Sequence, residues 1–205
     1  YPGEDRRYDN PEYEPFWAAA QDLNMPLSLH TGTRRGRDLY GRALGDDVRS
    51  VRDATARTTK VFYPAASMCD MIFSGVFERY PGLKVAIVEF ELSWVPYLLT
   101  SMDYTYEERV EEALYRFKGD LRPSDFFHNN IYLSFQEDDV GIRMRDIIGV
   151  DRLMWGSDYP HPESTFPKSQ EILDRILEGV PQDEKDKIVG ANVARLYGFD
   201  IEQIA

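Results

Sequence analysis

The sequence predicts an α/β fold built on a parallel β-sheet, and three observations lead to that prediction. Strand-length apolar runs alternate with helical patterns along the 205 residues. Two of the runs, residues 84–89 and 152–157, lack strict apolar/polar alternation, as strands buried on both faces do. Helical segments separate the runs, and parallel strands need such crossover connections.

Four segments have the length and composition of β-strands. They are residues 26–31, 84–89, 130–135 and 152–157. Helical patterns cover much of the remainder. They lie at residues 11–24, 59–80, the second half of 92–117, 138–148, 167–178 and 183–197.

Residues that favour helix ends mark several boundaries. Asn10 is expected to cap the first helix, which begins at Pro11, and Gly198 is expected to end the last. This order of elements leaves two architectures open, a doubly wound sheet and a (β/α)₈ barrel. A barrel needs eight strands, so this chain would supply about half of one.

Composition excludes several classes of protein. With 24 basic and 36 acidic residues the net charge is −12, which disfavours nucleic acid as a partner. No apolar run approaches the roughly 20 residues that cross a bilayer, so no membrane association is expected. Cys69 is the one cysteine, which favours a reducing compartment and a cytoplasmic location. The chain begins at Tyr1 and shows no signal-peptide pattern, GxGxxG fingerprint or P-loop.

Side chains suited to chemistry follow three of the predicted strands. His30 ends the first, Glu89 ends the second, and Asp158 follows the fourth. The carboxyl ends of parallel strands form the edge where catalytic groups project. Because imidazoles and carboxylates bind divalent ions, His30 and Asp158 are candidate metal ligands, each from a separate strand.

Each of these residues also has a structural interpretation. His30 can bond a backbone carbonyl, and Asp158 can cap a turn. Glu89 can form a salt bridge or lie at the N-terminus of the next helix, although its apolar flanks would also desolvate the carboxylate and suit it to acid–base catalysis. His128 precedes the third strand, at the opposite end of the sheet, and is expected to be structural.

Basic and polar side chains near these positions are further candidates. Arg35 and Arg37 follow His30 and could bind a substrate carboxylate, while a solvated loop or pairing with nearby aspartates is the alternative. His161 is either a partner of Asp158 or a simple loop residue. A GxSxG elbow is absent, which disfavours serine hydrolase chemistry.

Four segments, in collinear order over nearly the whole chain, resemble one known family. They read PLSLHTGT, ERYPGLKVAIVEFELSWVPYLLTSMD, MWGSDYPHPEST and IVGANVARLYGF. The sequence resembles the amidohydrolase-related metal-dependent enzymes, in the branch that includes aminocarboxymuconate semialdehyde decarboxylase and the aromatic acid decarboxylases. GSDYPH and the terminal G-x-N-x-A-R-L-Y-G are the most specific parts of this resemblance.

The resemblance implies a (β/α)₈ barrel with zinc or manganese at its C-terminal mouth. It implies that His30 is the metal ligand from the fifth strand and that Asp158 is the ligand from the eighth, beside the metal-bound water. The family's first-strand motif, acid-x-His or His-x-His, is not found in this sequence. Residues 1–205 are therefore expected to form the C-terminal part of a single barrel domain, about strands 5 to 8.

The resemblance further implies an enzyme that acts on a small molecule, a carboxy-lyase for a small organic or aromatic acid. Decarboxylases of this branch carry a histidine where this sequence has Glu89, so its acid–base role passes to Glu89 as a hypothesis. Hydrolysis of C–N or ester bonds by metal-activated water is the alternative. A non-catalytic barrel remnant or binding module is the second alternative, and the fragment alone is expected to be inactive.

One segment also bears on self-association. Residues 65–77 are apolar beyond one helical face. A buried packing helix and a homodimer interface are the two interpretations.

Overall fold

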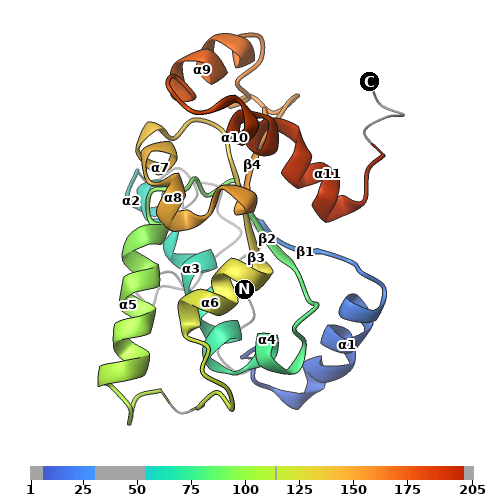
Figure 1. Cartoon of the computed structure of the whole chain (residues 1–205), viewed down its shortest axis with the longest axis vertical. Helices are drawn as coiled ribbons and strands as arrows, with labels where there is room; N and C mark the ends of the chain where they lie inside the picture. The colour runs from blue at the N-terminus through green and yellow to red at the C-terminus, as the bar shows by residue number, and fades with distance from the viewer. Residues whose placement is uncertain (1–6, 31–53, 114, 201–205) are drawn as a thin grey trace.

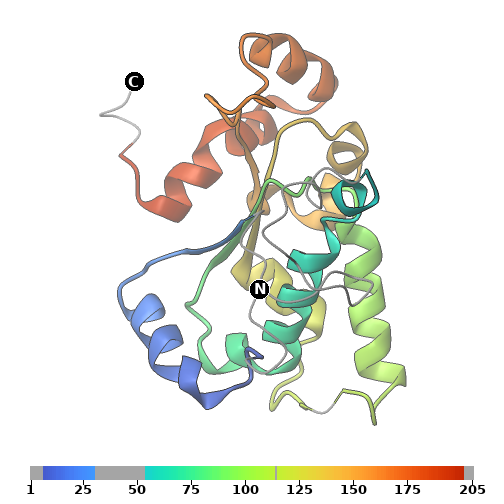
Figure 2. The same cartoon turned by 180° about the vertical axis from the view of Figure 1, so that it is seen from behind.

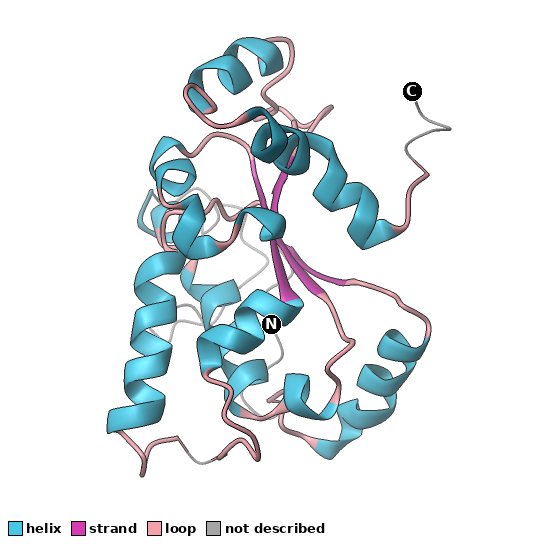
Figure 3. Ribbon diagram, in the orientation of Figure 1, coloured by secondary structure: helices cyan, strands magenta, loops and turns pink. Residues whose placement is uncertain are grey.

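A computed structural model describes residues 7–30, 54–113 and 115–200. Its strands form one sheet (Figure 3). The strands are parallel and lie in the order β1-β2-β3-β4. The strands are β1 Leu27–His30, β2 Val85–Val88, β3 Ile131–Phe135 and β4 Leu153–Trp155. Each lies inside a predicted run, so the parallel α/β prediction is confirmed.

The register of the sheet aligns the carboxyl ends of the strands. His30 pairs with Val88 across the first ladder. Phe135 pairs with Trp155 across the third. Because the strands are parallel and paired to their ends, the segments that follow all four emerge at one edge.

Helices surround this sheet (Figures 1 and 2). They are η1 Pro11–Tyr13, α1 Glu14–Asp22, α2 Ala54–Thr58, α3 Phe62–Phe73, α4 Val76–Arg79, α5 Val95–Glu108, α6 Pro123–Asn130, α7 Asp139–Arg143, α8 Arg145–Ile148, η3 Val150–Arg152, α9 Ser169–Ile176, α10 Gln182–Asp186, η4 Lys187–Ala191 (a π-helical segment) and α11 Asn192–Tyr197. None of the helices in the described ranges has the length and apolar character needed to span a bilayer.

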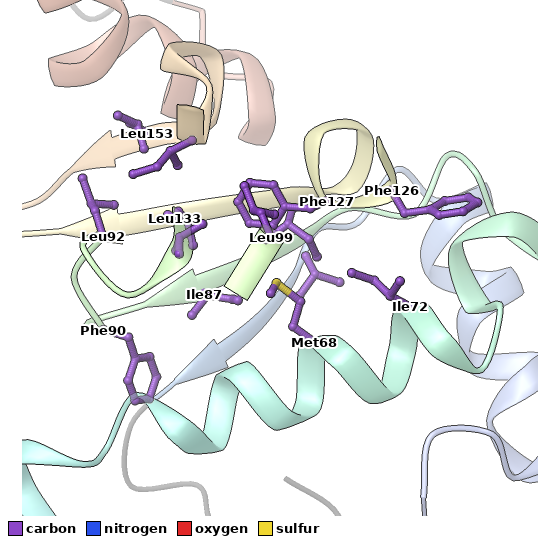
Figure 4. Packing of buried hydrophobic residues seen from close by; sticks show 14 of the residues in the cluster. Met68, Ile72, Ile87, Phe90, Leu92, Leu99, Phe126, Phe127, Leu133 and Leu153 are labelled. Carbon is purple, nitrogen blue, oxygen red and sulfur yellow. The ribbon is translucent and has the colours of Figure 1, made fainter. Parts of the chain in front are cut away.

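The larger core lies between the sheet and helices α3, α5 and α6 (Figure 4). Met68 of α3, Leu99 of α5 and Phe127 of α6 are buried with Ile87 and Leu133 of the strands. Burying such side chains contributes roughly 1.5–3 kcal/mol each. The inner face of α3 is part of this core, which supports the packing-helix interpretation, while the homodimer stays a prediction.

The other face of the sheet has a smaller apolar cluster. Ala86, Tyr132 and Met154 alternate along their strands with residues of the larger core, as side chains in a strand must. Val193 and Leu196 of α11 pack against them. Both faces of β2, β3 and β4 are thus covered, which explains why their sequences lack strict alternation.

Two buried asparagines fix the beginnings of strands. The Asn130 side chain donates to two backbone carbonyls just before β2, at 2.8 and 3.0 Å. Asn192 donates to two carbonyls around the start of β4, both at 2.8 Å. These bonds satisfy carbonyls of residues that precede β2 and β4, and of Leu153, the first residue of the outer strand β4.

Three helix expectations were wrong in detail. The helix expected in the second half of residues 92–117 is α5, which begins earlier, at Val95, and ends at Glu108. Pro96 lies in its first turn, where the missing N–H leaves no bond unmade. The helix expected over residues 59–80 is divided into α3 and α4 by Gly75, whose φ is 71°. Helix α6, which begins at Pro123, was not expected because its sequence is polar apart from two phenylalanines.

Candidate active site

His30 and Glu89 meet at the carboxyl edge of the sheet. His30 pairs with Val88, so the next residue of the chain beyond β2 reaches the imidazole. His30 Nε2 lies 2.8 Å from Glu89 Oε1. The Glu89 side chain is 21% exposed and the His30 side chain 47%. The pair is therefore accessible from solvent, and the sequence placed both residues at the correct edge.

Left-handed backbone conformations gather at this edge. Glu89, Glu91 and Asp158 have φ values of 68°, 57° and 59°. Among the described residues the one other non-glycine residue with positive φ is Asn24. Such conformations cost of the order of 1–3 kcal/mol each and persist where the surrounding structure compels them, which is common at functional sites. The strain points to function in the segments after β2 and β4.

Asp158 lies beside His161 in the segment after β4. Asp158 Oδ2 is 3.0 Å from His161 Nδ1, and the backbone N–H of His161 donates to the Asp158 carbonyl at 2.8 Å. The Asp158 side chain is 24% exposed. The same Nδ1 atom also accepts the backbone N–H of Glu163 at 3.3 Å. The structure thus brings His161 beside Asp158, and its role as a partner of that carboxylate stays a prediction.

Hydrogen bonds of Gln136, the residue after β3, reach the last residue of β4 and the segment after β2. The Gln136 carbonyl accepts from Trp155 Nε1 at 3.0 Å, and the Gln136 N–H donates to Glu91 Oε2 at 3.4 Å. Burial, opposed by the hydrogen bond from Gln136 and reinforced by the charge of Asp138, raises the pKa of Glu91. Glu91 is thus a half-buried acid close to the candidate site.

Sequence reasoning missed two residues of this edge, Glu91 and Asp138. Asp138 is 8% exposed and caps α7 by accepting the Gly141 N–H at 2.7 Å. An acid directly before a helical pattern is an N-cap signal. Asp138 also accepts the backbone N–H groups of Leu92 and Ser93, after β2, and this contact has no local sequence signal.

His128 lies away from the candidate site. It belongs to α6, which leads into the beginning of β3 rather than its end. Burial, together with the positive charge of Arg152, lowers the pKa of His128. This placement agrees with the structural role expected for His128.

The donor set fits a divalent ion in kind but is incomplete in number. His30 offers an imidazole and Asp158 a carboxylate, the groups that zinc and manganese bind. Within residues 7–30, 54–113 and 115–200, no group of three His, Cys, Asp or Glu side chains could hold a metal ion. β1 and β4 are the outer strands, about 14 Å apart along a flat sheet, so His30 and Asp158 approach one ion only if the sheet curves. Arg35 and Arg37 lie outside the described residues.

The strands lie side by side in the order of the chain, as in a (β/α)₈ barrel, whereas the strand order of a doubly wound sheet reverses. With histidine and carboxylate groups at the carboxyl edge, this is the arrangement of a barrel-type protein with a polar site at that edge. The chain belongs to the amidohydrolase family, because the sequence model of that family matches residues 2–199. The family and partial-barrel predictions are thereby confirmed.

Three similar proteins illustrate the relationship. A 2-amino-3-carboxymuconate-6-semialdehyde decarboxylase of Dictyostelium discoideum is 23% identical over 138 residues, 65% of this chain and 36% of the relative. The crystal structure of 5-carboxyvanillate decarboxylase from Sphingomonas paucimobilis matches with a TM-score of 0.74 and 22% identity, over 96% of this chain and 56% of that one. A dihydroxybenzoic acid decarboxylase from Polaromonas sp., solved with manganese and the inhibitor 2-nitroresorcinol, matches with a TM-score of 0.68 and 22% identity, over 94% and 55%. The chain spans little more than half the length of the two solved structures and about a third of the Dictyostelium relative.

Proposed function

We propose that this protein is a divalent metal-dependent carboxy-lyase that removes CO₂ from a small organic or aromatic acid. The observation that carries the proposal is the His30–Glu89 pair, with 2.8 Å between Nε2 and Oε1, at the carboxyl edge of a sheet of the amidohydrolase family. The decarboxylase activities named for the relatives favour this reaction over hydrolysis.

His30 and Asp158 would hold the ion, with further ligands from outside the described residues. Zinc or manganese suits an imidazole and a carboxylate, and the Polaromonas relative contains manganese. A histidine that binds a metal through one nitrogen commonly donates its other N–H to a carboxylate, which fixes the ring and raises its basicity. The contact between His30 and Glu89 has that form. When bound, the ion would anchor the substrate carboxylate and a neighbouring oxygen.

Glu89 is the proposed proton donor. Non-oxidative decarboxylation needs a proton on the carbon that bears the carboxylate, after which the C–C bond breaks and its electron pair stays with that carbon as CO₂ leaves. Glu89 would give this proton from Oε2 of its carboxyl group, while Oε1 accepts the His30 N–H, and it would regain a proton from solvent. Asp158, with His161 beside it, would orient a water molecule. Arg35 and Arg37 would bind a second anionic group of the substrate.

The test uses full-length protein supplied with manganese or zinc and a panel of hydroxylated aromatic acids. We expect release of CO₂ together with the matching decarboxylated product. His30→Ala is expected to abolish activity and lower the bound metal, while His128→Ala, the matched control at the other end of the sheet, keeps both. Release of an amine or alcohol from a second panel of amides and esters, with no CO₂ formed, would establish the hydrolytic alternative. Full-length protein that binds no divalent ion would overturn the proposal.

A further inference from the structure

The segment after β2 is attached to the segment after β3 by one buried carboxylate. Asp138 Oδ2 accepts the backbone N–H groups of Leu92 and Ser93, at 2.8 and 2.7 Å. Its other oxygen, Oδ1, accepts the N–H of Gly141 at 2.7 Å. Two oxygens thus hold three backbone donors from two different segments of the chain.

The same segment is also braced from within. Trp94 Nε1 donates to the carbonyls of Phe90 and Glu91, at 2.8 and 3.1 Å. Glu89 and Glu91 have left-handed φ values on either side of Phe90. Because this backbone is strained, its conformation depends on the bonds that hold it. The bonds to Asp138 hold it from outside, together with the bond from the Gln136 N–H to Glu91.

Packing leaves this junction little freedom to adjust. A Cβ added at Gly141 would lie 2.3 Å from Leu92 Cβ and 2.8 Å from Asp138 Oδ2. The first turn of α7 therefore presses directly on the residue whose N–H the carboxylate holds. A displacement of either segment would be transmitted to the other.

We propose that Asp138 is a positioning residue that holds Glu89 against His30. It fixes the backbone at Leu92 and Ser93, and this fixes the strained turn that aims the Glu89 carboxylate. The inference rests on the proposed function, in which Glu89 is the proton donor. Asp138 itself stays buried beneath the site and touches neither substrate nor ion.

Replacement by serine separates the two roles of Asp138. Serine is a good N-cap, so Asp138→Ser keeps a partner for the Gly141 N–H. The shorter side chain does not reach Leu92 and Ser93, so the link to the β2 segment is lost. Asp138→Asn keeps the size of the side chain but has only one accepting oxygen for the three donors.

Asp103→Ser is the matched control. The Asp103 carboxylate joins α5 to α6 by accepting from the Ser124 N–H at 2.9 Å and its hydroxyl at 2.7 Å. It too is a carboxylate that links two segments through a backbone donor, but the link lies in the second half of α5 and at the start of α6, the helix that leads into the beginning of β3.

The variants are compared in the full-length, metal-loaded protein by steady-state kinetics and amide hydrogen exchange. For Asp138→Ser we expect kcat to fall about 10- to 100-fold with a much smaller change in KM, since a misplacement near 1 Å costs about that much. The Leu92 and Ser93 amides should lose protection while the Gly141 amide keeps it. Asp103→Ser should lower stability and leave kcat of the folded protein unchanged.

An unchanged kcat in Asp138→Ser, with Leu92 and Ser93 exchanging faster, would overturn the inference. If Asp138→Ser does not fold, Asp138→Asn is the second variant, and an unchanged kcat there would also overturn it. Failure of the proposed function is distinct, because the unmodified protein would then release no CO₂ or bind no divalent ion. A crystal structure of the folded variant gives a readout independent of activity, with the Glu89–His30 contact of 2.8 Å expected to be lost.

Discussion

His30 and Glu89 come from neighbouring strands, and their side chains meet with Nε2 2.8 Å from Oε1. The contact joins an imidazole to a carboxylate at the one edge of the sheet where the backbone is strained at three non-glycine positions. It therefore connects the fold directly to the chemistry proposed for this edge, and it makes Glu89 the first residue to test.

Glu89→Gln should lower the rate of decarboxylation by about 100-fold or more, because an amide holds no transferable proton. Bound metal should remain, since His30 and Asp158 are unchanged. Glu91→Gln is the control in the same strained segment, and its amide oxygen can still accept the Gln136 N–H. Steady-state rates and metal content check both variants. Equal losses in the two variants would argue against a specific role for Glu89.

Gly141→Ala should destabilise the protein by about 1–3 kcal/mol, the range for an overpacked core. The added Cβ would lie 2.3 Å from Leu92 Cβ, so α7 or the segment after β2 must move. Gly190→Ala is the control, because a Cβ there meets no atom within 4 Å. Urea denaturation of full-length protein measures both. If the Gly141→Ala variant is as stable as the Gly190→Ala variant, the contact between α7 and the segment after β2 is loosely packed.

Asn130→Ala should lower the free energy of unfolding by about 1–3 kcal/mol, because it leaves the buried carbonyl of Leu83 and the partly buried carbonyl of Pro81 without their donor. Asn129→Ala, one residue earlier and exposed, should change stability by less than about 0.5 kcal/mol. Denaturant midpoints of the two variants give the comparison. A small effect at Asn130 would mean that water replaces the amide at the start of β2.

Glu14 gives a prediction about pH. Its carboxylate accepts from Arg79 at 2.7 Å and from the Tyr80 hydroxyl at 2.8 Å, and the hydrogen bond from Arg79 holds the pKa of Glu14 below its ordinary value. A lowered folded-state pKa contributes stability above the unfolded-state pKa, and this contribution is lost as the pH falls through the folded-state pKa. Because the pair is about one third exposed, Glu14→Gln should cost less than about 1 kcal/mol at pH 7.

The stability difference between wild-type protein and Glu14→Gln should therefore shrink as the pH is lowered, and become small at acidic pH where Glu14 is protonated. Thermal melts across a pH series measure this difference. A difference that grows toward acidic pH would have the wrong sign for this pair.

Strands β2, β3 and β4 were predictable because burial on both faces leaves a continuous apolar run in the sequence. Strand β1 instead alternates between half-buried and exposed residues. The meeting of His30 and Glu89 followed from one rule, that neighbouring parallel strands end at the same edge. Gly198 was also predicted correctly, since its φ of 70° favours a residue without a Cβ.

Features set by tertiary packing left no local signal. Helix α6 owes its stability to the burial of Phe126 and Phe127 rather than to a helical repeat of apolar residues. The bonds from Asp138 to Leu92 and Ser93 join residues 46 and 45 positions apart, and depend on how two loops approach each other. Whether His30 and Asp158 share an ion depends on the curvature of the whole sheet, which local sequence patterns do not specify.

The central claim is that His30 and Asp158 bind one divalent ion. The most direct measurement is a crystal structure of full-length protein grown with manganese or zinc, with the ion located by anomalous scattering. The account predicts an imidazole nitrogen of His30 and a carboxylate oxygen of Asp158, each about 2.0–2.2 Å from the same ion. An ion bound by other residues, with either His30 or Asp158 outside its coordination, would contradict the account.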